Sequence, residues 1–494
     1  MSSSSTCIQE KLKKIASKAI QTEDYETALC AIAAAGHILY MHNQVYTDET
    51  LEKQLLEIET CALKHVNNEF SEKNTDDKTV LFYDGFGLDT RGLALIFLRA
   101  LVRDGYRVVY VTSERARNAQ PEIHKAVEGY DVAWCYLDNQ GSYLSCAIEL
   151  CKYFEKFAPG HAFFYTTPND VSATIAFMHF SGAVKRYQID LTDHAFWLGV
   201  NAFDYCIALR DVGAKIAYHY RHISSEKLIM LPYYPTINYD TTFEGFPFDN
   251  TGRRVVFSGG ALYKTLGDKN NTYYRIVDAL LSRHDDLIFL YAGTGDDSQL
   301  LLLAERFPER VYHIAERKDL YQVMQNCVFY LNTYPMFGGL MMHYAAAAGK
   351  LPLTLKHEHD ADGLLFDQSN LQIEYETMEQ LVEDASHLLR DSNYLEEREA
   401  RLKGCIITED RFEKNLMDML TSGKTEFAFS LDWIDTSSFR LEYKQRYRHE
   451  ETIQQAIATK RHACLLGYFP VLFLKTFVLR TIKKLTKHIG KGNV

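Results

Sequence analysis

Paired cysteines and an export signal are both missing from this 494-residue sequence. Its ten cysteines are scattered singly, with no CxxC pair and without the density of a disulfide-stabilised secreted domain. The first residues, MSSSSTCIQEKLKK, contain no apolar segment of the kind that directs export. We therefore predict reduced thiols and a cytoplasmic chain.

Acidic residues are missing from the C-terminal end. No Asp or Glu follows Glu451, whereas eight basic residues do: Lys460, Arg461, Lys475, Arg480, Lys483, Lys484, Lys487 and Lys491. The other 46 basic and 65 acidic residues give the rest of the chain a net charge of −19. An acidic body argues against general nucleic-acid binding, which needs a positive surface. The basic end predicts a segment that seeks an anionic surface.

A hydrophobic run long enough to span a membrane is missing from this basic end. The run Leu465–Leu474 contains Pro470 and ends at Lys475, whereas a spanning helix needs about 20 apolar residues. Beyond the proline, apolar residues recur at helical spacing among lysines, namely Leu472, Phe473, Phe477, Val478, Ile482, Leu485 and Ile489. We predict an amphipathic helix within 461–494 that places residues 465–490 on anionic lipids, at the inner face of the plasma membrane. The alternative is a C-terminal helix packed in the body.

What the sequence does contain is an ordinary globular composition, 47% hydrophobic and 24% charged, over a length that suits two domains with extensions. Residues 1–75 carry apolar side chains at three- and four-residue steps and are predicted to be helical. The segment EDYETALCAIAAAG is typical of one helix of a tetratricopeptide-like hairpin, and one hairpin cannot form a solenoid. This extension either packs on the body or docks a protein partner.

Residues 76–240 alternate between short apolar runs and helical patterns. The run Val80–Tyr83 is followed by a glycine-containing loop, a helical pattern that ends at Gly105, and a second run, YRVVYVTSE. This order is a βαβ unit, which implies a parallel sheet with ligand-facing loops at the carboxyl ends of its strands.

Residues 241–405 repeat the same alternation after a stretch rich in proline and aromatic residues. We predict an α/β fold of two Rossmann-like domains that face a cleft. The helix predicted at 377–402 and the helical segment 406–460 are expected to return to the first domain.

Two glycine loops in the second half predict a diphosphate site. In LNTYPMFGGLMMHYAAAAGKLPLTL, a strand is expected to end at Thr333, Pro335 stops it, and Gly338 and Gly339 open a helix ahead of Leu340. Unpaired amides and the positive end of the dipole favour phosphate at such a helix start. A glycine pair before a helix is also an ordinary tight turn.

The second loop follows another expected strand. In SGGALYKTLGD, Ser258, Gly259 and Gly260 precede Lys264, whose charge can neutralise phosphate. Gly293, in the loop of YAGTGD, belongs to the same predicted site. The alternative is an exposed turn with a solvated lysine.

His194, in DLTDHAFWLG, is a candidate base because imidazole titrates near neutrality, and the adjacent Asp193 can fix its tautomer. The alternative is a hydrogen-bonded core histidine. The first-half loop DGFGLDTRG places Asp84, Asp89 and Arg91 on the predicted acceptor side, or as polar caps of a βα loop.

Residues 253–365 resemble the donor domain of GT-B glycosyltransferases. The LYK and GGL blocks are most similar to those of O-linked N-acetylglucosamine transferase and the bacterial protein N-glycosyltransferases. The resemblance implies a UDP-linked donor with Lys264 on its diphosphate and Gly338 to Leu340 capping it. It also implies that Asp193 and His194 face the reaction centre.

The chain departs from this family pattern at one point. Many retaining GT-B enzymes carry two glutamates around the glycine helix, and those positions hold Met336 and Tyr344 here. Glu316, after another expected strand, is the substitute we consider for binding ribose. No metal is expected, because GT-B enzymes use lysine and helix amides, and the HEHD cluster at 357–360 lacks metalloprotease spacing.

The sequence thus predicts a glycosyltransferase that acts on a lipid-linked glycan, a surface polysaccharide or a protein. A non-catalytic glycosyltransferase-like partner subunit is the alternative, because both glutamates are missing. A dinucleotide-dependent oxidoreductase is disfavoured, because no GxGxxG motif follows the first strand of either half.

Overall fold

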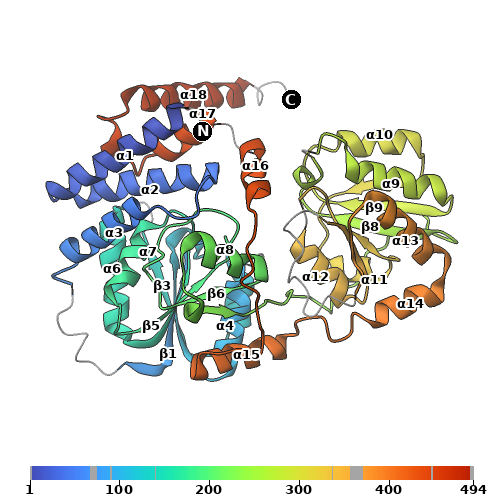
Figure 1. The fold of residues 1–494 in the computed structure, drawn as a ribbon, viewed down its shortest axis with the longest axis horizontal. Coiled ribbons are helices and arrows are strands. Elements are labelled where there is room, and N and C mark those ends of the chain that lie inside the picture. The colour runs from blue at the N-terminus through green and yellow to red at the C-terminus, as the bar shows by residue number, and fades with distance from the viewer. Residues whose placement is uncertain are drawn as a thin grey trace. The chain divides into compact units, whose positions relative to one another are not determined.

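A computed structural model describes residues 3–66, 75–89, 92–138, 141–266, 268–336, 338–356, 371–446 and 449–489 (Figure 1). The chain forms two compact units. Unit 1 comprises Met1–Leu231 together with Glu413–Val494, and unit 2 comprises Pro232–Phe412. The middle of the chain therefore forms one unit, while both ends belong to the other.

Unit 1 is built on a seven-stranded parallel sheet in the order β3-β2-β1-β4-β5-β6-β7. The strands are β1 (Asp76–Asp84), β2 (Arg107–Ser113), β3 (Val132–Leu137), β4 (Pro159–Tyr165), β5 (Lys185–Ile189), β6 (Tyr205–Ala208) and β7 (Leu228–Met230). Val80 pairs with Val108 of β2 and with His161 of β4, so β1 is an interior strand of the sheet. Apolar runs without alternation are typical of parallel strands buried on both faces.

Helices connect the strands of unit 1 and cover both faces of its sheet, as right-handed βαβ crossovers require. They are α4 (Ala94–Arg103), η2 (Glu114–Ala116), α5 (Pro121–Ala126), α6 (Tyr143–Phe157), α7 (Val171–His179), α8 (Asp211–Arg221) and η3 (Ser225–Lys227). The helix that the sequence predicted to end at Gly105 is α4, and that glycine has φ +77°, a left-handed conformation that suits glycine.

The N-terminal extension forms α1 (Ser3–Gln21), α2 (Tyr25–His42) and α3 (Glu49–Ala62). Asp24 and Asp48 accept hydrogen bonds from the first amides of α2 and α3, which fixes where those helices begin. Most of α2 is buried, including every residue from Ala28 to Ala35. The extension therefore packs on the body of unit 1, and α2 has no face left for docking a partner.

Unit 2 has a six-stranded parallel sheet in the order β10-β9-β8-β11-β12-β13. Its strands are β8 (Arg254–Gly259), β9 (Leu287–Ala292), β10 (Val311–Ile314), β11 (Tyr330–Leu331), β12 (Pro352–Leu355) and β13 (Glu374–Tyr375). Its helices are η4 (Leu262–Thr265), α9 (Thr272–Arg283), α10 (Ser298–Arg306), α11 (Leu320–Gln325), α12 (Gly339–Ala347), α13 (Met378–Arg390) and α14 (Ser392–Ala400).

Two predictions for unit 2 need correction. The strand expected to end at Thr333 ends at Leu331; the Asn332 amide still donates to the Leu353 carbonyl of β12 at 2.8 Å, and its side chain accepts from the Gly338 amide of the following turn. The helix expected over 377–402 is broken at Asp391, whose carboxylate accepts a hydrogen bond from the Tyr394 amide and begins α14. Both helices belong to unit 2, so they do not return to the first half.

The return to unit 1 begins at Glu413, within α15 (Glu409–Ser422). It continues through α16 (Ser437–Arg446), α17 (His449–Ile457), η6 (Ala463–Leu465) and α18 (Pro470–Ile489). Figure 1 shows α1, α2, α17 and α18 stacked on one side of the unit 1 sheet. The units change over at Leu231 and Phe412, a few residues from the predicted boundaries at 240 and 405.

Both units have the doubly wound α/β architecture predicted from the sequence. In each sheet, the first three strands of the sequence lie one after another toward one edge, and the later strands lie toward the other edge. The strand order therefore reverses between β1 and β4 and between β8 and β11. Ligands of such sheets bind outside the carboxyl ends of the strands at this switch point.

Candidate functional site

The switch point of unit 2 lies between β8 and β11. The two strands pair through Phe257 and Tyr330, and the Tyr330 hydroxyl donates to the Gly259 carbonyl at 3.1 Å. The loops that follow these strands are the two glycine loops that the sequence predicted to bind a diphosphate. The fold therefore brings them to the same edge of the sheet.

Glycine allows close backbone contact in the first of these loops. A side chain on Gly293 would place Cβ 1.9 Å from the Gly260 carbonyl oxygen, and one on Gly259 would place it 3.0 Å from the Ala292 oxygen. Gly260 has φ +126°, and its carbonyl accepts a hydrogen bond from the Tyr291 hydroxyl at 3.0 Å. The Gly260 and Gly293 loops are therefore packed backbone to backbone.

Ser258 stabilises this loop from the core side. It is fully buried, and its Oγ accepts a hydrogen bond from the Tyr273 hydroxyl of α9 at 2.6 Å. This contact ties the end of β8 to a helix. Ser258 therefore supports the loop from behind, which differs from the direct donor contact predicted for it.

Lys264 lies in η4, directly beyond the glycine pair, and its side chain is half-buried. Its carbonyl accepts a hydrogen bond from the Met336 amide at 3.1 Å. Met336 stands in the turn before α12, next to Pro335, which follows a cis peptide bond. The backbone of Lys264 is thus bonded to the turn before α12, although 72 positions separate Lys264 from Met336 in the sequence.

Asn332 holds the turn that precedes α12. Its buried Oδ1 accepts hydrogen bonds from the amides of Thr333 and Gly338, both at 2.9 Å. Gly338 caps the helix and Gly339 is its first residue, as predicted, while Leu340 is 39% exposed. Because Gly338 already donates to Asn332, the amides of the first turn of α12 are the ones available for an anion.

Glu316 and Tyr344 bear on how ribose is recognised. Glu316 is exposed in the loop after β10, and the Gly293 amide donates to the last residue of that strand, Ile314, at 3.0 Å. Glu316 therefore belongs to the same edge of the sheet. Tyr344, at one of the family's glutamate positions, donates its hydroxyl to the Thr236 carbonyl at 2.6 Å. It holds the segment that leads into unit 2.

In unit 1, the two acidic residues predicted on the acceptor side are engaged within the fold. Asp84 is fully buried and accepts hydrogen bonds from the amides of Phe86 and Gly87, each at 2.9 Å, and from the Tyr110 hydroxyl at 2.6 Å. Burial raises the pKa of its carboxyl, although these donors oppose the shift. Its side chain fastens the loop after β1.

Asp89 also accepts hydrogen bonds from backbone amides. It accepts hydrogen bonds from the amides of Glu122 and Ile123 at 3.0 to 3.2 Å and so caps α5. The polar-cap interpretation therefore fits both acids better than acceptor binding does. Arg91, the third residue of the prediction, lies outside the described residues.

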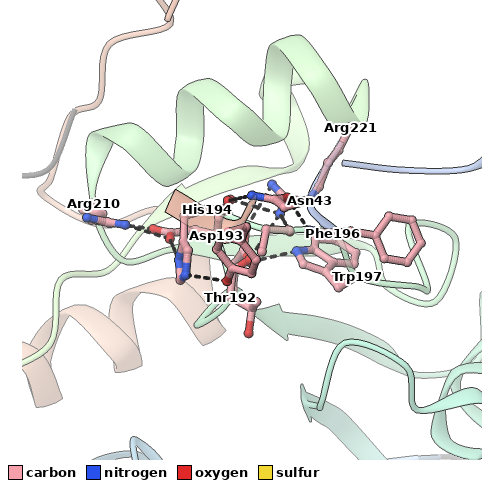
Figure 2. A network of polar contacts seen from close by, with 11 residues as sticks. Asn43, Thr192, Asp193, His194, Phe196, Trp197, Arg210 and Arg221 are labelled. Carbon is pink, nitrogen blue, oxygen red and sulfur yellow. Dashed lines mark hydrogen bonds and ion pairs between the residues drawn. The ribbon is translucent and has the colours of Figure 1, made fainter. Parts of the chain in front are cut away.

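His194 lies in a chain of polar contacts in unit 1 (Figure 2). Its Nδ1 is 3.1 Å from Asp193 Oδ1, as the tautomer argument required. Asp193 also receives two hydrogen bonds from Arg210, at 2.7 and 2.9 Å. Although burial works to raise the pKa of Asp193, Arg210 and His194 hold it well below its usual range. An ionised Asp193 can only accept, so His194 carries its proton on Nδ1.

The other ring nitrogen of His194 is also engaged. Nε2 is 3.1 Å from the hydroxyl of Tyr443, a buried residue of α16. With Nδ1 protonated, a neutral imidazole accepts a hydrogen bond from this hydroxyl on Nε2. The side chain is 33% exposed, but neither nitrogen is free to meet a substrate in this conformation.

The segment that carries His194 is fixed by residues far away in the sequence. The Asn43 side chain donates to the His194 carbonyl at 3.0 Å and accepts from the Phe196 amide at 3.2 Å. The buried Arg221 donates to three carbonyls, those of Thr192, Asp193 and Ala195. Figure 2 shows Asn43 and Arg221 reaching the segment from different elements.

Sequence reasoning missed Asn332, Arg210, Tyr443 and Asn43. Only Asn332 had a local signal, because a polar residue directly after a buried strand commonly binds the next loop. The other three act over long sequence distances. Among the described residues no group of His, Cys, Asp or Glu side chains is arranged to hold a metal ion, and the HEHD cluster lies outside them.

No protein-family model and no curated protein matches this chain. A glycosyltransferase from Rickettsia africae matches in structure with a TM-score of 0.50 at 10% identity, over 70% of this chain and 98% of that one. A mutant O-GlcNAc transferase from Thermobaculum terrenum gives 0.44 at 16% identity, over 92% and 83%. A UDP-GlcNAc 2-epimerase from Neisseria meningitidis, bound to UDP-GlcNAc, gives 0.46 at 13% identity, over 69% and 99%.

At these identities the likeness concerns the fold. Together with the two doubly wound sheets, the Rickettsia africae match assigns the chain the GT-B fold that the sequence predicted. In the described part of the chain, no helix combines the length and the apolar character that crossing a membrane requires.

Proposed function

We propose that this chain is a glycosyltransferase that takes a UDP-linked sugar as donor and holds its diphosphate at the carboxyl edge of the unit 2 sheet. The observation that carries the proposal is the hydrogen bond from the Met336 amide to the Lys264 carbonyl, at 3.1 Å. It joins the loop after β8 to the turn before α12. The segment that carries Lys264 and the turn before the helix start are therefore held together at one switch point, where doubly wound sheets bind ligands.

The chemistry expected of this site is stabilisation of a leaving group. In the transfer, the bond between the sugar carbon and the diphosphate breaks while an acceptor atom bonds to that carbon. Negative charge then grows on the diphosphate. Lys264 and the first amides of α12 offset this charge without a metal, because preorganised donors act most strongly where charge develops. Glu316 is proposed to accept hydrogen bonds from the ribose hydroxyls.

We assign the role of base to His194. Asp193 keeps the proton on Nδ1, so Nε2 is the atom that accepts a proton from the acceptor. Because Tyr443 occupies Nε2, an acceptor hydroxyl has to take the place of the phenol. The proposal thus includes a movement of the Tyr443 side chain or of α16.

The engagement of both His194 nitrogens also favours a second candidate function. A histidine held on both sides within the fold, together with Met336 and Tyr344 at the family's glutamate positions, suits a non-catalytic partner subunit that retains the GT-B fold. Release of the sugar from a UDP-sugar by the purified chain separates the two functions, because only an enzyme turns over.

For the acceptor we propose a membrane-borne glycan, either lipid-linked or part of a surface polysaccharide, ahead of a protein. The chain is then peripheral at the inner face of the plasma membrane. The basic C-terminal end supports this location, because it contains no acid after Glu451.

Thermal unfolding with nucleoside diphosphates tests the donor site. UDP is expected to raise the melting temperature of the full chain more than GDP or ADP, because a ligand stabilises the state it binds. Lys264→Ala is expected to lose most of this shift while it melts at the same temperature without ligand. Lys269→Ala is the matched control, since it removes an exposed lysine of the same loop. An equal UDP shift in all three proteins would contradict the donor site.

A further inference from the structure

The exposed apolar side chains of this protein are concentrated in one place. Nineteen large hydrophobic residues are exposed in the described part of the chain, and seven of them lie between Leu466 and Leu479. Most of the others stand singly, as is normal for a soluble surface. A concentrated apolar patch on a folded protein marks an interaction surface.

The helix α18 carries most of this patch, and its two faces differ. Leu472 and Phe473 pack on the core of unit 1, and Thr476 accepts a hydrogen bond from Gln454 of α17 at 2.9 Å. Val471 and Leu474, on the other side, are 63% and 64% exposed. The helix is therefore attached to the body along one face and presents an apolar stripe along the other.

The start of this segment is anchored in unit 1. Leu465 is fully buried and Phe469 nearly so, and both belong to the core. Lys11 of α1 donates to the Tyr468 carbonyl at 2.7 Å and lies 4.4 Å from the centroid of the Phe469 ring. The stripe is thus held in a fixed place on unit 1, rather than at the end of a loose tail.

Charge identifies what covers the stripe. Lys475 is exposed beside it, and in the sequence the basic residues from Arg480 to Lys491 follow with no Asp or Glu among them. A second copy of α18 would bring like charges together. A different face of a second copy is also a poor partner, because Leu301 and Leu302, the only other neighbouring pair of exposed large apolar residues described, form a much smaller patch. An anionic lipid surface offers both an apolar boundary and negative headgroups.

We propose that the α18 stripe, formed by Val471, Leu474, Phe477 and Val478, docks unit 1 on an anionic bilayer, parallel to its surface. The apolar side chains enter the boundary between headgroups and acyl chains, and Lys475 contacts the headgroups. This inference rests on the membrane location proposed above and deepens it by naming the face that docks. Docking is independent of the donor site, so it would occur whether or not the chain transfers sugar.

Vesicle sedimentation of the full chain tests the stripe. The chain is expected to sediment with vesicles of equal parts phosphatidylcholine and phosphatidylglycerol, less so as salt is raised, and to stay in solution with phosphatidylcholine alone. Leu474→Glu is expected to weaken binding at least tenfold. Lys475→Gln should weaken it about fivefold, the effect of one basic residue near such a surface.

Leu302→Glu, in α10, is the matched control because Leu302 is 57% exposed and lies in the other unit. It is expected to bind vesicles like the unaltered chain. Melting temperatures and UDP shifts should be the same in all variants, so a failed donor site and a failed stripe give different results. The proposal is overturned if Leu474→Glu still sediments with anionic vesicles. It is also overturned if light scattering shows a dimer that Leu474→Glu separates and no vesicle binding.

Discussion

The two units share a strand order, but the loops at their switch points are occupied by different kinds of residue. In unit 1, the loop after β1 is filled by its own side chains: Asp84 accepts from two backbone amides and from Tyr110, and Phe86 packs against Tyr165 with ring centroids 4.6 Å apart. In unit 2, the equivalent loop contains Gly259 and Gly260 and contacts its neighbours through backbone atoms.

This difference supports the proposal that unit 2, and not unit 1, holds the diphosphate. Two amides of the unit 1 loop, those of Phe86 and Gly87, are already used by the buried Asp84, whose carboxylate would repel an anion. A glycine loop without side chains lets an anion approach the backbone. We call the switch point of unit 1 sealed, because Asp84 and Phe86 fill its loop, whereas the corresponding loop of unit 2 contains Gly259 and Gly260.

Gly293→Ala should have the largest effect on this contrast. Its new Cβ would lie 1.9 Å from the Gly260 oxygen, so the two loops must separate. We expect a loss of about 5 kcal/mol in the stability of unit 2, at the upper end for single substitutions, and loss of the UDP shift. Denaturant unfolding and calorimetry with UDP measure both.

Gly349→Ala is the control for this change. Gly349 has φ +77° and nothing within 4 Å of a built Cβ, so only backbone strain of about 1 kcal/mol is expected. If Gly293→Ala costs no more than this control, close backbone packing does not define the loop.

Asp84→Ala tests the sealed switch point. It leaves two amides and the Tyr110 hydroxyl without their acceptor in a buried place, at a cost of about 4 kcal/mol. Chemical denaturation should show this loss in unit 1, while UDP binding by unit 2 stays the same. Asp89→Ala, which removes a helix cap, should cost about 1 kcal/mol. If Asp84→Ala lowers the affinity for UDP, the proposal that unit 2 alone binds the nucleotide is wrong.

Glu52, in unit 1, makes the stability of that unit depend on pH. Its buried carboxylate accepts from the Gly199 amide at 2.8 Å, and its second oxygen has no hydrogen-bond partner among the described residues. Burial raises its pKa from 4.5 to about 7, against the pull of nearby backbone amides. Since the folded state holds this proton more tightly, the contribution of Glu52 to the free energy of unfolding is fully present below pH 4.5 and is lost as the pH rises to about 7.

Glu52→Gln should remove this fall, because the amide cannot ionise. We expect the variant to be more stable than the unaltered chain by about 3 kcal/mol above neutral pH, with no gain at acid pH. Unfolding free energies measured across this range check the sign. Glu49→Gln, an exposed position in the same helix, should leave the pH dependence as it is.

Tyr443→Phe should have the smallest effect. Loss of one hydrogen bond to His194 Nε2 costs about 1 kcal/mol, and the ring nitrogen signal of His194 in NMR spectra should shift. Tyr220→Phe removes a hydroxyl that donates to Ile434 near the same segment and should leave His194 unchanged. An unaltered His194 signal in Tyr443→Phe would mean that the phenol does not hold the imidazole.

The predictable part of this protein was its local pattern. Glycine pairs after apolar runs gave the positions of both loops of unit 2, because strand, turn and helix start are each encoded within a few neighbouring residues. The direction of a polar side chain is not encoded in this way. Asp84 and Asp89 stand in a ligand-type loop yet turn toward backbone amides, which only the packed loop determines.

Contacts between segments that are far apart in the chain could also not be predicted from the sequence. Tyr443 meets His194 and Asn43 binds the same segment because α16 and α2 pack on unit 1. Neither residue has a motif. The break between α13 and α14 was missed for a different reason, since apolar spacing continues through Asp391 and conceals its capping role.

The division of the chain has a consequence for its synthesis. Unit 2 is complete once Phe412 has left the ribosome, whereas unit 1 still lacks the residues from Glu413 onward. Ile453, Ile457 and Leu465 are part of the same core as the alanines of α2. Until these late residues emerge, the helices made first remain partly uncovered, so the earliest part of the chain to be translated is among the last to reach its final packing.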